Sequence, residues 1–497
     1  MIKMKSIGLF FSLVLTSIVG SGQIISNPTI WLRADSACLG AAFWHDVSGN
    51  NVNVVPSLGT LPDTFSLMNF NKCFHIDGNG ACYLVPLEIR SRNIDAIMVY
   101  KTDDSTAENG LWYFPTDSAS VGLTTHRILS DHGIISYDTV NRHNATTNYV
   151  AQSWDTSLLD SLSLHIGRVD TIPFQGQLSE FVFFNQHIGD SALTQWLSYL
   201  AIKYGITLHK RNYLDSKKRC IWNSDTFSNY SYSIAGIGRD DGMGLFQKQT
   251  LYADGAIIFG MGTLASDNES NPSYLEDGTF AVVGMDCCAL DNPTQLYISN
   301  GDVHSVIGRS MIQITGEDLS NIPTFLNISK NIVPDSLAPI LIIDRSGSGE
   351  YPLSDVEYVY PDIQNLCNSF VFSNLHWDID GNGRDAFCFS VSPSEDLRDN
   401  ATPRAANADG EEQNIQGRCR YSLTPNPNDG HYRLEIELNE ISDVTVTIST
   451  TDGKNIRTLL RKGDNHYVIN GYEATPGAYF VEIISKVEHQ TLKMIIK

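Results

Sequence analysis

The chain has 497 residues, which is more than one hydrophobic core usually holds, so about two to four domains are expected. Hydrophobic residues make up 42% of the sequence and aromatic residues 10%, a composition typical of folded proteins and not of disordered ones. The formal net charge of −22 argues against nucleic-acid binding, because phosphate contacts need clustered lysine and arginine, whereas an acidic surface suits divalent cations or solubility.

The N-terminus has the pattern of a secretory signal peptide. Lysines at positions 3 and 5 precede an apolar run from Ile7 to Val19, and Gly20-Ser21-Gly22 offers small residues for cleavage. A membrane-anchor helix is the alternative, but the run is short for a membrane span. We expect residues 1–22 to be removed. No other stretch is apolar over such a length, so we expect a soluble mature chain without a membrane span.

Residues 26–208 contain many short strand patterns and one helix pattern. Strands are predicted at residues 30–35, 96–100, 163–168 and 175–184. The helix is predicted from Ser191 to Tyr204, and its apolar face comprises Leu193, Trp196, Leu197, Leu200, Ala201 and Tyr204. Ser191 stands where an N-cap belongs, and Gly205 stands where a left-handed C-cap would end the helix.

Four motifs in this block carry a resemblance to a known family. They are Trp31-Leu32-Arg33-Ala34-Asp35, Asp46-Val47-Ser48-Gly49-Asn50, Gly176-Gln177-Leu178-Ser179-Glu180, and the segment Tyr199-Leu200-Ala201-Ile202-Lys203-Tyr204-Gly205-Ile206-Thr207-Leu208. Together they resemble the concanavalin-like, laminin-G-like β-sandwiches of Bacteroidetes surface proteins, and the last motif is the most specific. The resemblance implies a β-sandwich over residues 26–208, followed by a characteristic second module.

The same fold also hosts glycoside hydrolases, so a catalytic function has to be considered. Retaining hydrolysis needs two carboxylates about 5 Å apart, which a strand segment such as Glu-x-Asp-x-x-Glu would provide. Residues 26–208 contain no such segment, and Glu180 stands alone within the strand motif. We find no zinc-protease, serine-hydrolase or phosphate-binding motif in the chain either, so the sequence favours a protein that is not an enzyme.

Residues 209–393 read as a second all-β sandwich, the follow-on module of that resemblance. Short strand patterns occur at residues 338–344, 356–360, 369–372 and 386–390, each bounded by turn residues. The glycine-rich Gly236-Ile237-Gly238 lies in a strand pattern without a helix after it, which argues against nucleotide binding. The resemblance implies no catalytic activity for this module.

Two acidic loops in this module are candidate calcium sites. The first runs from Asp344 through Ser346, Ser348 and Glu350, with Asp355 at the twelfth place, which is the spacing of a calcium loop with serines in place of carboxylates.

The second loop holds its candidate ligands at Asp378, Asp380, Asn382 and Asp385. It matches the first half of the calcium-loop pattern, but Phe389 occupies the twelfth place, so the usual bidentate carboxylate is missing. The alternative for both loops is that Asp, Asn and Gly only form tight turns. Turn formation is the better interpretation of a shorter polar segment, Asp46-Val47-Ser48-Gly49-Asn50.

Residues 394–417 are polar and read as a linker, and residues 418–497 read as a small antiparallel, Ig-like β-sandwich. Alternating strands at 432–438 and 444–449 precede a hairpin turn at Asp452-Gly453. Pro476-Gly477 then reverses the chain before the next strand, and the last strand ends on Lys497.

This C-terminal segment resembles the type A sorting domain of the type IX secretion system of Bacteroidetes. The resemblance rests on Asn426-Pro427, Asp452-Gly453-Lys454, Pro476-Gly477-Ala478-Tyr479-Phe480-Val481 and the lysine-terminated last strand. It implies that the type IX machinery is a partner and that the protein is secreted or fixed at the outer cell surface, usually with this domain cut off.

Nine cysteines lie beyond the predicted signal peptide, and an exported protein normally oxidises such cysteines to disulfides. Bridges between Cys73 and Cys82, across a predicted hairpin, and between Cys367 and Cys388 are candidates, and the odd count leaves one thiol over. A zinc site is disfavoured because no Cys-x-x-Cys pair occurs.

These observations favour an exported binding or adhesion protein that holds glycans or extracellular matrix. Two alternatives stay open. One is a structural protein of a surface layer or biofilm matrix, with the modules as spacers and no discrete ligand. The other is a glycan-active hydrolase or lyase with an unfamiliar arrangement of carboxylates.

Overall fold

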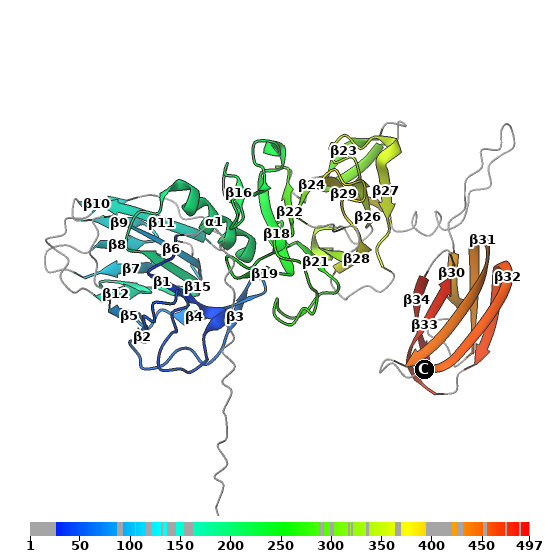
Figure 1. The fold of residues 1–497 in the computed structure, drawn as a ribbon, viewed down its shortest axis with the longest axis horizontal. Coiled ribbons are helices and arrows are strands. Elements are labelled where there is room, and N and C mark those ends of the chain that lie inside the picture. The colour runs from blue at the N-terminus through cyan, green and yellow to red at the C-terminus, as the bar shows by residue number, and fades with distance from the viewer. Residues whose placement is uncertain are drawn as a thin grey trace, which may run out of the picture. The chain divides into compact units, whose positions relative to one another are not determined.

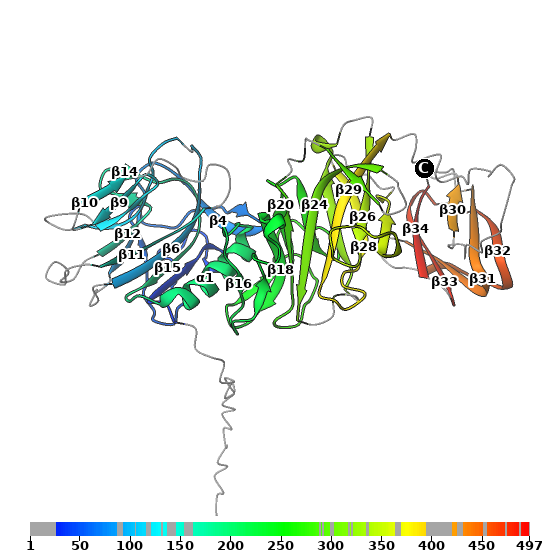
Figure 2. The ribbon, with the colours of Figure 1, turned by 90° about the horizontal axis from the view of Figure 1, so that it is seen from above.

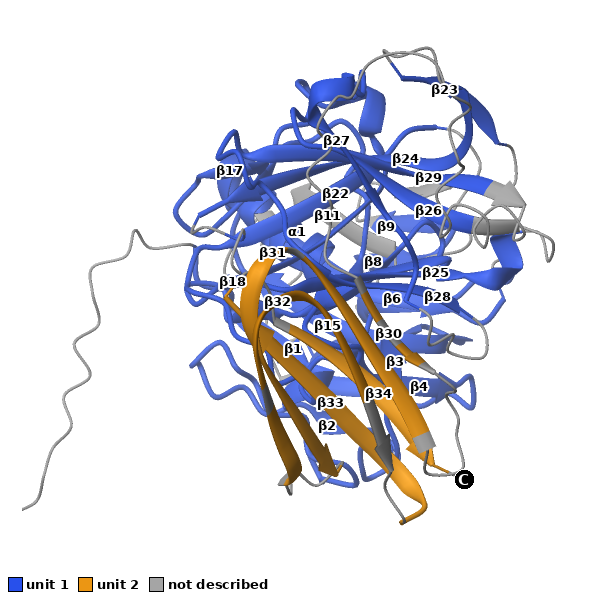
Figure 3. Ribbon diagram, turned by 90° about the vertical axis from the view of Figure 1, so that its right-hand side faces the viewer, with its two compact units in different colours: residues 1–403 blue, residues 404–497 orange. Residues whose placement is uncertain are grey.

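The computed structural model describes residues 26–86, 93–104, 106–115, 121–130, 133–136, 146–153, 163–287, 290, 293–298, 303–316, 319, 322–333, 337–362, 369–393, 420–424, 431–450, 455–472, 475–486 and 489–496. The chain divides into two compact units, residues 1–403 and residues 404–497 (Figure 3). The predicted signal peptide, the predicted linker and the Asp452-Gly453 turn lie outside the described residues. Within the described residues, no helix is long and apolar enough to cross a membrane.

The first sandwich of unit 1 consists of two antiparallel sheets that face each other (Figures 1 and 2). One sheet has the order β11 (Thr146–Ser153), β6 (Asn93–Thr102), β15 (Gln175–Phe184), β4 (Asn71–Asp77) and β3 (Ser66–Met68), with β1 (Ile30–Arg33) also paired to β15. The other has the order β10 (Gly133–Ser136), β9 (Arg127–Ser130), β8 (Val121–Thr124), β7 (Gly110–Phe114), β12 (Ser163–Ile166), β5 (Tyr83–Pro86) and β2 (Val55–Pro56). Trp44, Phe74 and Trp112 lie in the core between the two sheets.

Strand β15 is buried on both faces. Phe181 and Phe183 point into the core of the first sandwich, whereas Val182 and Phe184 point to the opposite side of the sheet. That opposite side is covered by the helix α1 (Gly189–Tyr204), whose residues Trp196 and Leu200 belong to the same apolar cluster as Val182. Burial on both faces explains why this strand is nearly continuously apolar in sequence.

The helix is buried on all sides, although the sequence predicts a single apolar face. Every residue from Leu193 to Tyr204 is buried, because the first sandwich covers one side of α1 and the second module covers the other. Gly205 ends the helix in the left-handed conformation (φ 66°), and its N–H donates to the Ala201 carbonyl, which confirms the predicted C-cap. The predicted N-cap is wrong, since Ile188 precedes the first helical residue and makes no side-chain cap.

The second module of unit 1 is also built from two antiparallel sheets. The larger has the order β19 (Leu245–Gln247), β18 (Tyr232–Asp240), β22 (Phe280–Met285), β24 (Val303–Thr315), β29 (Arg384–Pro393), β26 (Leu337–Asp344) and β27 (Val356–Val359), with β23 (Thr294–Tyr297) paired to β24. The smaller has the order β20 (Gln249–Tyr252), β21 (Ile257–Met261), β25 (Thr324–Ser329) and β28 (Ser369–Leu375). Phe259, Trp377 and Phe387 lie in the core between them, and the strands predicted at 356–360, 369–372 and 386–390 are confirmed as β27, β28 and β29.

Unit 1 has a few shorter elements as well. They are the strand pairs β13 (Arg168–Val169) with β14 (Ile172–Pro173) and β16 (Tyr213–Leu214) with β17 (Cys220–Trp222), and the 3-10 turns η1 (Ala34–Ser36), η3 (Ser228–Tyr230), η4 (Lys330–Ile332) and η5 (Leu353–Asp355).

Unit 2 is a small antiparallel β fold, as the strand alternation predicts. Its strands are β30 (Arg420–Thr424), β31 (His431–Thr450), β32 (Asn455–Tyr472), β33 (Gly477–Ser485) and β34 (His489–Ile496). Irregularities in the pairing of β31 with β32 near Ser442 interrupt these two long strands. Leu434, Val446, Val481 and Met494 are buried in the core of this unit.

The predicted bridge between Cys73 and Cys82 is wrong in this structure, where both are free thiols. The two residues do not flank a hairpin: β4 pairs with β15 and β3, whereas β5, which follows Cys82, pairs with β12 and β2 in the opposite sheet. The Cys73 thiol lies in the apolar cluster under α1. Cys388 is a free, buried thiol too, and Cys367 lies outside the described residues.

Because one apolar cluster joins the first sandwich, α1 and the second module, we expect unit 1 to unfold as a single cooperative body. Leu200→Ala leaves a cavity in that cluster, where Leu200 is fully buried, and should lower the free energy of unfolding by about 3 kcal/mol. Urea unfolding followed by tryptophan fluorescence and circular dichroism should shift as one transition. Leu264→Ala, at a 38% exposed position, is the control, and two separated transitions in the Leu200 variant would contradict the shared core.

Candidate functional site: the buried junction between the two modules

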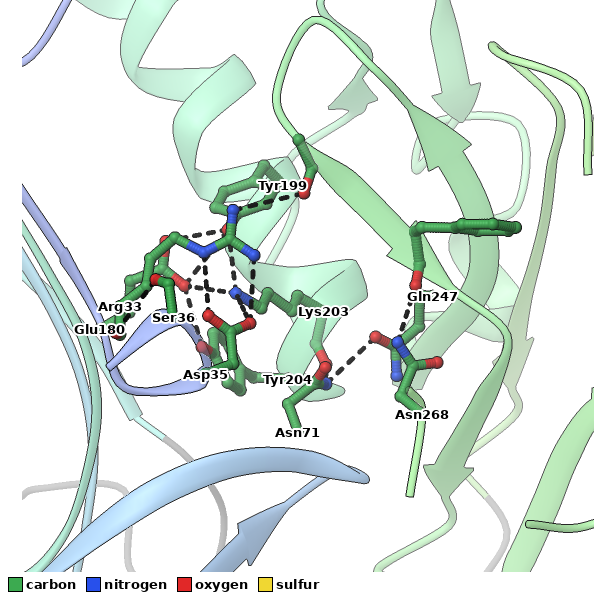
Figure 4. A network of polar contacts seen from close by, with 12 residues as sticks. Arg33, Asp35, Ser36, Asn71, Glu180, Tyr199, Lys203, Tyr204, Gln247 and Asn268 are labelled. Atoms are coloured by element: carbon green, nitrogen blue, oxygen red, sulfur yellow. Dashed lines mark hydrogen bonds and ion pairs between the residues drawn. The ribbon is translucent and has the colours of Figure 1, made fainter. Parts of the chain in front are cut away.

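A fully buried carboxylate, Glu180, lies in the polar network beside α1, on the side of the first sandwich (Figure 4). Its Oε1 atom accepts hydrogen bonds from the Trp31 indole N–H at 2.5 Å and the Tyr199 hydroxyl at 2.9 Å. Its Oε2 atom accepts from the Lys203 ammonium at 2.9 Å and the Tyr204 hydroxyl at 2.8 Å. Donors on both oxygens compensate for the loss of water around this charge.

The Lys203 ammonium is shared between Glu180 and a second carboxylate, Asp35, whose Oδ2 atom lies 2.8 Å away. Asp35 in turn receives two hydrogen bonds from the Arg33 guanidinium, at 3.0 and 3.1 Å. Arg33 also donates to the carbonyl of Gly244 in the second module, at 3.4 Å. The two positive and two negative side chains therefore form one chain of ion pairs that ends on the second module.

Three of the four charged side chains, Arg33, Asp35 and Lys203, have pKa values that are shifted by their surroundings. Burial acts to lower the pKa of Lys203, but the negative charges around it, Glu180 foremost, raise it and determine the direction. Burial acts to raise the pKa of Asp35, but Lys203 and then Arg33 hold it well below its usual value. Burial likewise opposes the charge of Arg33, yet its acidic surroundings raise its pKa. The pKa shifts of Lys203, Asp35 and Arg33 all favour the charged forms of these side chains.

The local sequence explains how these side chains meet. Tyr199 and Lys203 are four residues apart on α1 and therefore lie on the same face of the helix. A register irregularity in β15 lies between Leu178 and Glu180, so the strand's alternation changes at the acidic residue. Sequence reasoning missed this cluster, although Arg33, Asp35, Glu180 and Lys203 all lie inside the family motifs. The available signal was a lysine in the middle of an otherwise apolar helix end.

A hairpin of the first sandwich forms a second polar link to the second module. The turn between β3 and β4 consists of Asn69 and Phe70, both with positive φ (48° and 64°), which is the backbone of a type I′ hairpin. The Asn69 amide donates to the Lys203 carbonyl and the Thr250 hydroxyl, both at 3.0 Å, and accepts from the Leu251 N–H at 2.7 Å. The Phe70 carbonyl accepts the Asn268 N–H at 2.8 Å.

Neighbouring side chains complete this link. Asn71 donates to the Lys203 carbonyl at 2.7 Å and to the Gln247 side chain at 3.1 Å, and Gln247 donates to the Asn69 carbonyl at 3.2 Å (Figure 4). Gln247 and Thr250 are fully buried, and Asn69 and Asn71 are at most 7% exposed. Because these groups satisfy one another only when both modules are in place, the junction is a rigid interface.

A surface cleft on the first sandwich is the best candidate for ligand binding. It has a volume of about 480 Å³ and lies between the loop that contains Leu58 and Asp63 and the segment of β4 and its turn that carries His75, Asp77 and Asn79. Leu58 is 62% exposed, so the cleft combines an apolar side chain with several polar ones. Aromatic packing of Trp44, Phe74 and Tyr83, with ring centroids 5.1–6.5 Å apart, lies in the core beside it.

In the first predicted calcium loop, the carboxylate of Asp344 is buried and is used by its own loop. Its Oδ1 atom accepts from the Ser346 N–H and hydroxyl, at 3.0 and 2.6 Å, and its Oδ2 atom accepts from the Ser348 hydroxyl and the N–H groups of Gly349 and Tyr351. Glu350 is exposed, and Asp355 accepts from the Ser354 hydroxyl. The loop therefore brings together Asp344, Ser346 and Ser348, whereas Asp344, Glu350 and Asp355 do not form a group of three that could hold a metal ion.

In the second loop, Asp378 accepts the N–H of Gly383 at 2.7 Å, and Asp380 accepts the side chain of Asn382 at 2.7 Å. Asp385 is fully buried and accepts the Asp378 N–H at 2.7 Å and the Arg345 guanidinium at 3.0 Å. Burial raises the pKa of Asp385 to about 6, against the opposing effect of the Asp378 N–H and Arg345.

The two loops are neighbours, which the sequence does not reveal. The side chain of Asn382 donates to the carbonyls of Arg345 and Ser346, both at 3.2 Å. In the residues that the structure describes, no group of three or more His, Cys, Asp or Glu side chains lies close enough to hold a metal ion. Calcium binding by either loop stays a prediction.

Comparison with known proteins identifies the C-terminal unit. Residues 422–497 match the family described as a secretion system C-terminal sorting domain, and residues 193–376 match a domain of unknown function. The sorting domain is that of the type IX secretion system, so the protein is delivered to the outer cell surface or the extracellular space. No curated protein matches the chain.

Three solved structures share limited similarity with the chain. A dimeric latent PorU from Porphyromonas gingivalis matches at 10% identity and a TM-score of 0.14, over 84% of this chain and 31% of that one. The BSP domain of a biofilm associated protein matches at 9% identity and a TM-score of 0.15, over 88% of this chain and 82% of that one. A truncated AlyQ with CBM32 and alginate lyase domains matches at 11% identity and a TM-score of 0.13, over 66% of this chain and 96% of that one. The chain thus spans less than a third of the PorU chain, and TM-scores this low carry no argument about fold or function.

The hairpin link can be tested by Asn69→Ala, which removes the buried hydrogen bonds of the Asn69 side chain and leaves their partners unpaired. We expect the free energy of unfolding to fall by about 3 kcal/mol, measured by urea unfolding. Asn374→Ala is the matched control, because Asn374 also has a positive φ (56°) but is exposed. Equal losses in both variants would assign the effect to backbone conformation and contradict the link.

Calcium binding can be tested by the melting temperature of the mature chain with millimolar calcium and with chelator. If the second loop binds calcium, the melting temperature should rise by about 2 °C or more, and Asp380→Asn should remove the rise. Ser348→Ala in the first loop is the control, because the Asp344 carboxylate there is already saturated with donors. An unchanged melting temperature would identify both loops as hydrogen-bonded turns.

Proposed function

We propose that this exported protein is a non-catalytic binding protein of the outer cell surface, and that the cleft beside His75 holds a segment of a glycan. The main support for this proposal is the cleft itself. Its volume of about 480 Å³ lies in the range of small-ligand pockets, and its lining offers the carboxylate, amide and imidazole groups that bind sugar hydroxyls.

The polar groups of the cleft are held in place by their neighbours. The His75 imidazole lies 3.0 Å from the Asp103 carboxylate, and the Asp77 carboxylate accepts both the backbone and the side-chain N–H of Asn79, each at 3.2 Å. Side chains that are already oriented lose little entropy when a ligand binds. Leu58 supplies an apolar contact for the face of a sugar ring. The laminin-G-like resemblance of the motifs in residues 26–208 supports the same assignment.

The absence of a catalytic role is part of the proposal. Glu180, the acidic residue of the β15 strand motif, is fully buried and bonded on both oxygens, so a polysaccharide cannot reach it. This arrangement argues against Glu180 as the acid or nucleophile of a hydrolase, which must touch the glycosidic oxygen or the anomeric carbon.

A structural role in a surface layer or biofilm matrix is the second candidate. The observation that favours it is the rigid junction, in which α1 and the β3–β4 hairpin join the two modules through one apolar cluster and buried hydrogen bonds. A rigid two-module body suits a spacer as well as a binding arm, so ligand binding distinguishes the two functions.

Binding can be tested by screening the mature chain on an array of immobilised plant, algal and animal glycans, followed by calorimetric titration of the strongest ligand. We expect saturable binding that weakens about tenfold or more in His75→Ala and Leu58→Ala. Tyr232→Ala, at a 55% exposed position of the second module, should bind like the wild type. Absence of saturable binding to every glycan would favour the structural role.

A further inference from the structure

The Lys203 side chain lies between two carboxylates from separate parts of the chain. Its nitrogen is 2.8 Å from Asp35 Oδ2 and 2.9 Å from Glu180 Oε2. The side chains of Lys203 and Glu180 are 4% and 0% exposed, and that of Asp35 is 19% exposed. The aromatic rings of Tyr199 and Tyr204 lie 5.5 and 5.2 Å from the nitrogen, so little water reaches it.

We propose that Lys203 and Asp35 form an isopeptide bond within the chain, which covalently links the η1 turn to the end of α1. The amine nitrogen is in contact with an oxygen of the carboxyl group that it would attack. That oxygen is bonded to Cγ, the atom under attack, so the contact holds the amine beside its target, and a fixed intramolecular pair has an effective concentration far above that of free reactants.

The reaction needs no reactant other than these two side chains. The Lys203 ammonium and the Asp35 carboxylate together become one amide and one water molecule. The Lys203 nitrogen forms a bond to Asp35 Cγ, and one Cγ–O bond breaks. Of the three ammonium protons, one stays on the amide nitrogen and two leave with the departing oxygen. The net charge of the site does not change.

Glu180 is placed to carry a proton. Its Oε2 atom contacts the Lys203 nitrogen, so it can take a proton from the ammonium to produce the nucleophilic amine. It returns the proton as the Asp35 oxygen leaves and is itself unchanged. Burial by itself acts to lower the pKa of Lys203 and so assists this transfer, whereas the neighbouring carboxylates raise that pKa and keep the free amine a minor form.

Arg33 is placed to stabilise negative charge on the Asp35 oxygens. Its two N–H groups contact both of these oxygens, at 3.0 and 3.1 Å, in a fork-like arrangement. Attack by the amine moves electron density onto the same oxygens, where a preorganised donor pair stabilises it. Arg33 and Asp35 also line a cleft of about 320 Å³, which gives the released water a way out. After the reaction Arg33 and Glu180 are left as one positive and one negative charge.

The test is the mass of the chain from residue 23 to 497, expressed with an initiating methionine and measured after complete reduction of its thiols. We expect the intact mass to fall short of the calculated mass by one water. Trypsin digestion of the denatured chain should then give residues 34–72 joined to residues 169–210, because a linked Lys203 is not a cleavage site. Fragmentation should place the link between Asp35 and Lys203.

Two variants check the roles of the side chains. Glu180→Gln keeps the shape but cannot accept the proton, so it should retain the full calculated mass and release the peptide 169–203. Glu269→Gln, in the exposed pair with Lys72, should lose one water like the wild type. A wild-type chain with the calculated mass that is cleaved after Lys203 would overturn the proposal, whatever the variants do. A water loss located at other residues would also overturn it.

Discussion

Unit 1 depends on the stabilisation of one buried negative charge. Glu180 has no exposed surface, and an ionised carboxylate without water is stable only when donors surround it. Those donors come from β1 through Trp31 and from α1 through Tyr199, Lys203 and Tyr204, so strand and helix must both be in place. Lys203 brings a second charge, which Asp35 neutralises. Each of these charges is balanced by the next one along the series. The last of them, Arg33, donates a hydrogen bond to the second module at Gly244.

Much of the secondary structure can be predicted from the sequence, because the alternation of apolar residues and the turn residues are local signals. The predicted strands at 96–100, 175–184 and 386–390 and the left-handed end of α1 at Gly205 follow from such signals. The structure of the junction does not follow from local signals. A periodic apolar stripe predicts one buried face of a helix, whereas α1 is buried on all sides, since two separate sheets cover it. Which sheets meet there depends on contacts between residues far apart in sequence, such as Asn69 with Leu251.

The acidic loops show why a motif alone leaves two interpretations open. The spacing that brings oxygen ligands around calcium also places a carboxylate opposite the N–H groups of its own turn. In the Asp344 loop, backbone N–H groups and two serine hydroxyls occupy both oxygens of the carboxylate. In the Asp378 loop the cation that pairs with Asp385 is Arg345, a residue of the first loop. That pairing depends on β26 and β29 being adjacent in the sheet, which spacing along the sequence does not reveal.

The helix α1 also determines where one module ends and the other begins. The domain of unknown function starts at residue 193, inside α1, whereas the sequence motifs place the end of the first sandwich at residue 208. Both boundaries have a physical basis. Trp196 and Leu200 pack in one cluster with Val182 of the first sandwich and with Trp222 and Phe280 of the second module. A helix that fills the gap between two sheets contributes to the stability of both, so unit 1 should open as a whole and not module by module.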